Sequence, residues 1–595
     1  MSLEYGMIGN GRTIALVSDE ASIDWFCMPR FDSPSIFAKL LDKSKGGEFR
    51  VDPEHECKRS QEYVDDTNVL KTTFSDEDAE IELYDYFPYY EDKEGVKRAS
   101  EIQRFVVPKK GSMKLKFGIN PKFNYATGIP KVSIEGDRIA YKTEKEILYV
   151  YSNMDLSKIV EGKYIDIDKE SYIALTYNMI KPGQSVNDIK ADMKKTQEHW
   201  KKWASNIKAP DQFRKHVIRS ALTLRMLTYD DSGAIVAAPT TSLPEIIGDV
   251  RNWDYRYCWI RDASFTVLAL LRIGKSDVAH EFITWLNKIF SESGAMQQPL
   301  FGINGERELK ERTLDYLEGY MGSRPVRVGN AAYLHRQQDI FGELLDAIHF
   351  FYVDYRVRDL SNEQWGVVYS SAESAINSWK NKDSSIWEFR NMQEHFTFSK
   401  VMSWVAVDRA VKIAKHFKKY DAATRWSGVA RQIKRDVVKN GWNEKMKSFV
   451  QYYGSDTLDA SLLLMPFFGF IEYDHPKMKA TIDAIKAGLL KNGFVIRYSA
   501  KDDFGMPKNA LIACTFWLIE ALYEIGEKEE AVKLFNNIIS HSNHLGLLSE
   551  DIDPYSGELV GNFPQAYSHI ALINTSTILG GFGRTGKRGR KRSPA

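Results

Sequence analysis

Cysteine is scarce in this sequence, with four residues in 595. Cys27, Cys57, Cys258 and Cys514 are widely separated and include no Cys-X-X-Cys pair. The sequence therefore predicts neither a zinc site nor a disulfide framework. Free thiols are typical of a reducing compartment, so we expect a cytoplasmic protein.

Long apolar stretches are also lacking. No run approaches the roughly 18 uninterrupted apolar residues that a membrane-spanning helix needs. The N-terminus, Met1 to Gly6, has no basic segment followed by an apolar run, so we expect no secretion signal. Both absences favour a protein that has no membrane partner.

The chain has no strong excess of charge of either sign, with 81 Lys and Arg against 80 Asp and Glu. Six of the cations fall in segment 583–595, which has no acidic residue. Without that segment the chain is mildly acidic, which is not typical of a nucleic-acid-binding protein. We expect 583–595 to be a disordered basic tail.

The sequence predicts two domains, because 595 residues exceed what one ordinary core holds. Residues 1–185 read as short strands divided by frequent turns, which is typical of an antiparallel β-sandwich. Residues 186–210 are charged and helical, and predict a linker helix. Residues 211–582 show apolar spacings of three and four, which predict paired helices in an α/α toroid. Long, aromatic-rich loops are expected at its site-bearing end.

Segment 251–262 combines three Arg, two Asp, two Trp and two Tyr in twelve positions. Planar donors and acceptors suit sugar hydroxyls, and aromatic rings suit the C–H faces of a pyranose. We therefore expect a polyol-binding pocket here. Asp262 could instead cap the helix that follows, and the two roles are compatible.

Two carboxylates stand in different local settings. Glu388 lies between Trp387 and Phe389, which predicts a dry site where the carboxyl keeps its proton. The alternative is a half-buried ion pair with Arg390. Glu550 lies in a polar loop that predicts an ionised carboxylate.

Clustered acids near Glu550 also leave calcium binding open, although the spacing does not fit an EF-hand. One neutral and one ionised carboxyl group is the pair that glycoside hydrolysis uses. Hydrolysis with inversion predicts roughly 6.5–9.5 Å between the two groups.

The loop motifs resemble those of glycoside hydrolase family 15, the glucoamylases and related trehalases, over nearly the whole chain. The resemblance rests on Gly9–Thr13, Ile23–Trp25, Pro29–Pro34, Trp259–Asp262, Arg324–Asn330, Ile386–Glu388, Ser549–Glu550 and Gly561–Ala566. It implies an N-terminal antiparallel β super-sandwich followed by a catalytic (α/α)6 barrel, with no cofactor and no metal.

The resemblance also implies the roles of single residues. It makes Glu388 the general acid and Glu550 the general base of an inverting exo-hydrolase that releases β-D-glucose. The substrate-binding residues that it implies are Arg261, Asp262, Trp259, Tyr255, Trp387 and Arg497. The chain departs from many bacterial relatives at Met506–Asn509, where Lys508 replaces a Glu at the expected rim of the site.

The substrate stays open at this point. The main expectation is a glucoamylase-type activity on soluble malto-oligosaccharides, and the alternative is α,α-trehalase. More distant alternatives are a disaccharide phosphorylase of the same architecture and a non-catalytic glycan-binding protein. The expected partner is a small carbohydrate, with no nucleic acid, and a homo-oligomer is left open.

Overall fold

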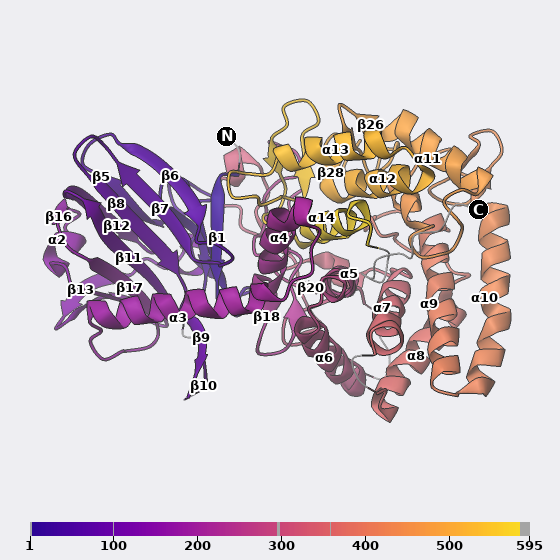
Figure 1. Ribbon diagram of the computed structural model, residues 1–595, viewed down its shortest axis with the longest axis horizontal. Coiled ribbons are helices and arrows are strands. Elements are labelled where there is room, and N and C mark those ends of the chain that lie inside the picture. Colours follow the sequence, from indigo (N-terminus) through magenta and orange to yellow (C-terminus); the bar gives the residue numbers. More distant parts are fainter. Residues whose placement is uncertain (1–2, 94, 99, 294–297, 357–358, 583–595) are drawn as a thin grey trace.

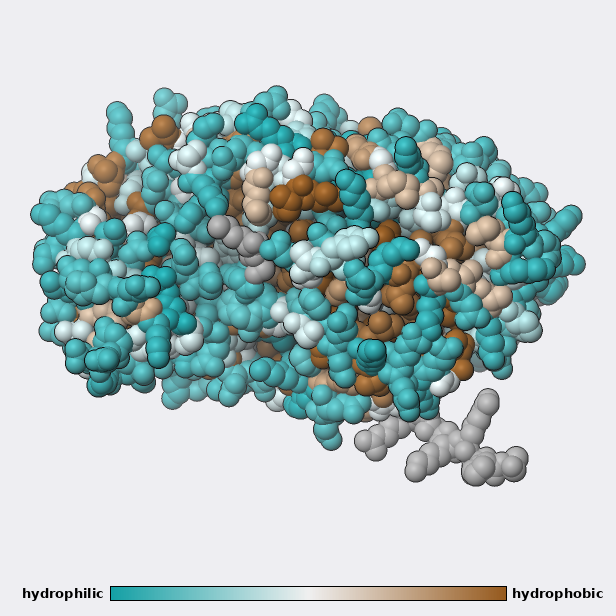
Figure 2. All heavy atoms as spheres, turned by 90° about the horizontal axis from the view of Figure 1, so that it is seen from above, coloured by the Kyte–Doolittle hydropathy of each residue, from teal (hydrophilic) through white to brown (hydrophobic). Residues whose placement is uncertain are grey.

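The computed structural model describes residues 3–93, 95–98, 100–293, 298–356 and 359–582, so the predicted basic tail lies outside the described residues. A strand-rich N-terminal region stands beside a helical region (Figure 1). The face in Figure 2 is largely hydrophilic, and several hydrophobic residues show over the helical half. No helix in the described parts of the chain is long and apolar enough to cross a membrane.

The N-terminal region is built on two antiparallel sheets. One has the strand order β1-β2-β3-β5-β12-β16, with β4 beside β3. Its strands are β1 (Tyr5–Gly9), β2 (Ile14–Ser18), β3 (Ser22–Cys27), β4 (Ser35–Phe37), β5 (Glu48–Pro53), β12 (Met113–Asn120) and β16 (Ile165–Ile167).

The other sheet has the order β13-β14-β15-β17-β11-β8-β7-β6. Its strands are β6 (Lys58–Tyr63), β7 (Leu70–Ser75), β8 (Glu80–Tyr86), β11 (Glu101–Lys110), β13 (Lys131–Glu135), β14 (Arg138–Lys142), β15 (Ile147–Ser152) and β17 (Ser171–Tyr177). On β7, Leu70, Thr72 and Phe74 are buried while the residues between them are half-buried. This period of two is expected of a strand with one face on a core.

Small elements complete this region. They are the hairpin of β9 (Tyr89–Asp92) and β10 (Gly95–Arg98), and the short helices α1 (Phe123–Ala126) and α2 (Leu156–Val160). The linker helix is α3 (Val186–Ser205), which begins with a reciprocal capping box between Ser185 and Asp188. It runs along the sandwich toward the helical region (Figure 1), and Asp192 accepts a 2.6 Å hydrogen bond from Tyr90.

The helical region is a double ring. The inner ring closes through successive packing of α5 (Ile260–Arg272), α7 (Ile340–His349), α9 (Thr397–His416), the 3-10 helix η5 (Ala460–Leu464), α12 (Ile512–Ile525) and α14 (Ala566–Leu579). The outer helices are α4 (Arg214–Met226), α6 (Asp277–Ser293), α8 (Asn362–Ser378), α10 (Tyr420–Asn440), α11 (Pro476–Leu489) and α13 (Lys528–Ser540). The sequence places them outside because one stripe is apolar: α10 buries Ala423, Trp426, Ala430, Ile433 and Val437.

The helices of the described barrel are joined by loops of two lengths. Short turns lead from inner to outer helices, such as 417–419 between α9 and α10. Long segments lead to the next inner helix, such as 227–259 before α5 and 541–565 before α14. The long segments carry short strand pairs, including β28 (Ala510–Leu511), β29 (Asp551–Ile552) and β30 (Leu559–Val560). The N-termini of the inner helices therefore open on the long loops.

The sandwich contacts these long loops directly. Trp25 Nε1 donates to the Pro239 carbonyl at 2.8 Å, and Arg256 donates to the Ser33 carbonyl at 2.9 Å. Tyr316 Oη donates to the Tyr125 carbonyl at 2.9 Å. The N-terminal region thus supports the site-bearing end of the barrel.

Candidate active site

One pocket opens among the long loops. It encloses about 930 Å³ of empty space, including its open mouth. All eight residues chosen from the sequence line it: Tyr255, Trp259, Arg261, Asp262, Trp387, Glu388, Arg497 and Glu550. They come from segments more than 290 residues apart, and the closed inner ring brings them together.

Glu388 faces the pocket from a tight turn. Its Oε1 accepts hydrogen bonds from Trp259 Nε1 at 2.7 Å and Gln337 Nε2 at 3.0 Å, and Arg261 Nη2 lies 3.4 Å away. These three donors all contact the same oxygen. The other oxygen, Oε2, is therefore available to a group in the pocket.

The expected enclosure of Glu388 by its sequence neighbours is wrong. Phe389 packs against Phe396 and Tyr498, at 5.3 and 5.4 Å between ring centroids. The Glu388 side chain is 23% exposed. Consecutive residues of the turn point in different directions, so flanking aromatics do not determine the surroundings of the carboxyl group. The alternative pairing is also wrong, because Arg390 binds Glu311 through two hydrogen bonds of 3.1 and 2.7 Å.

The turn that carries Glu388 has an unusual backbone. Ser385 and Glu388 have φ values of 66° and 61°, in the left-handed region that non-glycine residues rarely adopt. Asp503 Oδ2 accepts the backbone N–H groups of Arg390 at 2.6 Å and Asn391 at 3.2 Å. Such strain persists only where surrounding contacts hold it, and Asp503 supplies two of them.

Glu550 is buried, so the expectation of an ionised carboxylate in a polar loop is wrong. Its residue is 3% exposed. Its Oε1 accepts a 2.6 Å hydrogen bond from Tyr255 Oη, and its Oε2 has no hydrogen-bond partner among the described residues. Burial raises the pKa of Glu550 well above the usual value, and the charges of Glu245 and Asp551 raise it further. The local sequence is polar, but distant segments cover it.

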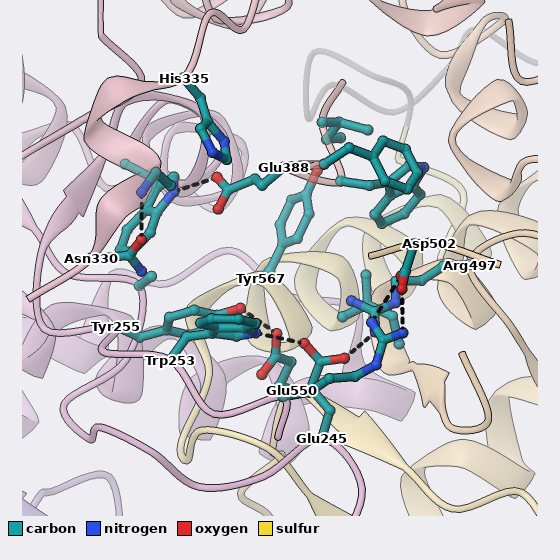
Figure 3. Close-up of a pocket in the computed structure, with 18 of the residues that line it drawn as sticks. Glu245, Trp253, Tyr255, Asn330, His335, Glu388, Arg497, Asp502, Glu550 and Tyr567 are labelled. Atoms are coloured by element: carbon teal, nitrogen blue, oxygen red, sulfur yellow. Dashed lines mark hydrogen bonds and ion pairs between the residues drawn. The ribbon is translucent and has the colours of Figure 1, made fainter. Parts of the chain in front are cut away.

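The same loop holds both carboxyl groups. Tyr255 binds Glu550 and Trp259 binds Glu388, and the two rings meet edge to face with centroids 5.4 Å apart. Figure 3 shows Glu388 and Glu550 at opposite sides of the pocket. The aromatic pair therefore connects the residues that hold the two carboxyl groups.

Arg261 and Asp262 are two buried charged residues in the lining of the pocket. Arg261 Nη1 donates to Gln337 Oε1 at 3.0 Å and lies 3.4 Å from Asp339. Asp262 lies 3.4 Å from the Arg261 guanidinium, and its Oδ1 has no hydrogen-bond partner in the described chain. Burial raises the pKa of Asp262 to about 6, although Arg261 opposes the shift. Asp262 lies in the first turn of α5, so pocket lining and a favourable helix-dipole contact are combined.

Arg497 and Trp387 line the pocket but have protein partners. Arg497 Nη2 makes an ion pair with Glu245 and lies 3.9 Å from Asp551. Trp387 Nε1 donates to Asp459 at 3.0 Å. Their pocket-facing surfaces, rather than these committed polar groups, are available to a ligand.

Two family models match the chain. The one described as Glycosyl hydrolases family 15 matches residues 211–577, and the one described as Trehalase-like, N-terminal matches residues 3–156. The chain belongs to glycoside hydrolase family 15. The resemblance read from the loop motifs is thus confirmed, and the protein is a glycoside hydrolase.

Several relatives of this family 15 chain match along nearly its whole length. A trehalase of Thermoplasma acidophilum is 36% identical over 575 residues, covering 95% of this chain and 98% of its own. A trehalase of Mycolicibacterium smegmatis is 35% identical over 616 residues, covering 96% and 90%. A bacterial glucoamylase structure complexed with acarbose has a TM-score of 0.73 at 13% identity, covering 99% of this chain and 95% of its own. That likeness confirms the sandwich and (α/α)6 barrel.

Sequence reasoning missed several residues of this family 15 pocket. Gln337 holds Glu388, and Glu245 pairs with Arg497. His335 and Tyr567 also line the pocket, and His335 Nδ1 and Tyr567 Oη have no hydrogen-bond partner in the described chain. Burial lowers the pKa of His335, which favours the neutral form of its ring. No local motif marks Glu245, Gln337 or His335, whereas Tyr567 directly follows the motif Gly561–Ala566.

Two sequence-based alternatives can be compared with the family 15 site. Lys508 is exposed and does not line the pocket, so its charge lies outside it. Asp553 does not join Glu550 and Asp551 in a calcium site, because it accepts the N–H groups of Tyr555 and Ser556 in a turn. Within the described residues no cluster of three or more His, Cys, Asp or Glu side chains could hold a metal ion.

Proposed function

We propose that this family 15 enzyme is an inverting α,α-trehalase, with Glu388 as general acid and Glu550 as general base. The observation that carries the proposal is the arrangement of the two carboxyl groups. Each is held through Oε1 by an aromatic residue of one loop, and Glu550 Oε2 has no hydrogen-bond partner among the described residues. Inverting hydrolysis needs two carboxyl groups on opposite sides of the bond that breaks.

Each group then has one task. Glu388 gives its proton to the glycosidic oxygen as the bond from that oxygen to the anomeric carbon breaks. Glu550 Oε2 takes a proton from a water molecule, whose oxygen bonds to the anomeric carbon from the opposite face. The attacked unit leaves as β-D-glucose, and the other unit of trehalose leaves in its original α configuration. A proton must return from Glu550 to Glu388 before the next turnover.

The buried pair Arg261 and Asp262 suits the glucose unit that is attacked. Arg261 offers guanidinium donors and Asp262 Oδ1 is an acceptor without a partner in the described chain, so the pair can bind neighbouring hydroxyl groups. Trp259 and Tyr255 offer ring surface beside them. Such contacts orient the anomeric carbon between the two carboxyl groups.

The names of full-length relatives favour trehalose over malto-oligosaccharides. Relatives 35–36% identical to this chain are called trehalases, whereas the glucoamylase likeness at 13% identity supports the fold alone. The glucoamylase-type activity, which was the main expectation from the sequence, thus becomes the second candidate.

A substrate panel tests the proposal. The purified protein is given trehalose, maltose, isomaltose and maltotriose, with and without inorganic phosphate, and the released anomers are followed by NMR. We expect trehalose to be cleaved fastest, independently of phosphate, into equal initial amounts of β- and α-glucose. Only α-glucose at early times would overturn inversion, faster cleavage of maltose would restore the glucoamylase candidate, and a phosphate requirement would indicate a phosphorylase.

Substitution tests the two roles. We expect Glu388→Gln and Glu550→Gln each to lower kcat on trehalose by at least about 100-fold, because each removes an acid–base step. Circular dichroism and thermal unfolding show whether the fold is retained. Turnover close to that of the unsubstituted enzyme in either variant would remove that residue from the mechanism.

A further inference from the structure

We propose that Glu245 and Asp551 are positioning residues that control the charge of Glu550 and so set the lowest pH at which the enzyme works. The inference rests on the proposed role of Glu550 as the base. It concerns a cluster of three carboxyl groups around one guanidinium at one wall of the pocket.

The cluster is assembled from three distant segments. Glu245 comes from the loop before α5 and Arg497 from the loop before α12. Glu550 directly precedes β29, and Asp551 is its first residue. Glu245 Oε2 pairs with Arg497 Nη2, and Glu245 Oε1 accepts from Trp253 Nε1 at 3.2 Å. Figure 3 shows Glu245 between Glu550 and Arg497.

Glu245 is held firmly in this place. Its backbone carbonyl accepts a 2.6 Å hydrogen bond from Asn509 Nδ2, and its N–H donates to the Arg251 carbonyl at 3.0 Å. Arg497 Nη2 makes its closer ion pair with Glu245 and lies 3.9 Å from Asp551 Oδ2. The second nearby cation, Arg251, is committed to Asp502 through hydrogen bonds of 2.9 and 2.6 Å.

Glu550 therefore has no ion-pair partner among the described residues, and Asp551 shares Arg497 with Glu245 at the longer distance. Exposure is 3% for Glu245, 3% for Glu550 and 0% for Asp551. Neither oxygen of Asp551 nor Oε2 of Glu550 has a hydrogen-bond partner in the described chain, and Tyr255 is a neutral donor to Glu550. Three ionised carboxylates cannot share one committed guanidinium in such a dry place at low cost. The cluster therefore retains a proton into the neutral range, and burial raises the pKa of both Glu550 and Asp551.

This retained proton limits the reaction. A base must be ionised, so activity is lost as the pH falls through the pKa of Glu550. The charge on Glu245 acts twice, because it repels ionised Glu550 directly and occupies the cation that could stabilise it. Removing that charge should free Arg497 to face Glu550 and Asp551, and should extend activity to lower pH.

The pH dependence of kcat/KM on trehalose tests the inference. The acid limb is the low-pH side of the profile, where activity is lost as Glu550 takes up a proton. In Glu245→Gln we expect this limb to move down by about one pH unit or more. The freed Arg497 is then the nearby opposite charge, and such a charge lowers a carboxyl pKa by about 1–3 units. Asp551→Asn should move it in the same direction but less, because Arg497 stays bound to Glu245. The same limb position in both variants and the unsubstituted enzyme, with only a lower kcat, would show that both residues are merely structural.

Glu343 provides a matched control. It is 0% exposed and neither of its oxygens has a hydrogen-bond partner in the described chain, but its electrostatic neighbours are Asp339, Arg261 and Asp346 rather than Glu550. We expect Glu343→Gln to leave the acid limb in place. An equal shift in this variant would mean that any buried carboxyl moves the limb, which overturns the specific claim.

A second readout separates this inference from the proposed function. A buried carboxyl with a raised pKa ionises first in the unfolded chain, so the free energy of unfolding falls as pH rises between the unfolded and folded pKa values. Urea unfolding between about pH 4 and pH 8 should show a smaller fall in Asp551→Asn than in the unsubstituted protein. An unchanged slope contradicts the inference even without turnover. If no α-glucoside is hydrolysed but the slope changes, only the proposed function fails.

Discussion

At the residue scale, Gly561 shows how closely the backbone packs on Glu550. Its φ is 80°, which favours glycine. A Cβ at this position would lie 2.8 Å from Glu550 Cβ and 2.9 Å from Glu550 Oε2. The proposed base therefore has room only because residue 561, eleven positions further along the chain, is a glycine without a side chain.

We expect Gly561→Ala to lower kcat/KM on trehalose by at least about 100-fold, because a displacement of 1 Å in a catalytic group can cost this much. Gly454→Ala is the matched control, since Gly454 has φ of 81° and nothing within 4 Å of an added Cβ. Both variants carry the same backbone strain of about 1–2 kcal/mol. Similar losses of activity in the two would contradict a role for the contact with Glu550.

The identities of the pocket residues were accessible from sequence, but their surroundings were not. Tyr255, Trp259 and Arg261 belong to one dense segment, so composition alone marks them. Glu550 was expected in water because its sequence neighbours are polar. It is buried by Tyr255 and Glu245, about 300 residues earlier, which only the closure of the barrel brings near.

At the scale of elements, the turn at 384–391 depends on the loop before α12. Asp503 accepts two backbone N–H groups of that turn, from Arg390 and Asn391. These bonds link the segment with Glu388 to a loop more than 100 residues further along the chain. Asp503 is therefore placed to position the proposed acid without itself being the acid.

We expect Asp503→Ala to lower kcat by about 10- to 100-fold with a smaller change in KM, because a loosened turn misplaces Glu388. Asp503→Asn should restore most of the loss, since its side-chain oxygen can still accept. Asp76→Ala is the control: Asp76 accepts two backbone N–H groups, from Asp78 and Ala79, on the sandwich. Steady-state kinetics on trehalose compare the three, and a failure of Asn to rescue activity would point to a role for the charge.

A helix is easier to predict from sequence when only one of its faces is buried. Within 211–582 the spacing of three and four is clear in the outer helix α10, which buries Ala423, Trp426, Ala430, Ile433 and Val437. Every residue of α14 is buried, so this helix has no polar face and no such period. A helix buried on every side, such as α14, is therefore harder to delimit from sequence than α10, which has one apolar stripe.

At the scale of the whole molecule, Arg256 joins the two regions. Arg256 is fully buried. It donates hydrogen bonds of 2.8 and 2.7 Å to Asp254 and one to the Ser33 carbonyl of the N-terminal region. Asp254 in turn accepts the N–H of Gly329 at 3.1 Å. The loop whose Tyr255 and Trp259 bind the two catalytic candidates is thus attached to the N-terminal region through the buried ion pair of Arg256 and Asp254.

We expect Arg256→Met to destabilise the protein by about 3–5 kcal/mol, because it leaves Asp254 buried without its cation. Arg425→Met should cost less than about 1 kcal/mol, since the Arg425 side chain is 56% exposed in its pair with Glu373. Thermal and urea unfolding measure both. Equal losses would show that the buried pair contributes no more than a surface one.

The contacts between sandwich and barrel have a consequence for the order of synthesis. Trp25, Ser33 and Tyr125 leave the ribosome before the loops that they hold, and α14 begins more than 440 residues after Tyr125. At about 5–20 residues per second, this interval is tens of seconds. We expect the N-terminal region to be folded by then. The loops at the catalytic end of the barrel would therefore pack against an already folded sandwich when the barrel forms.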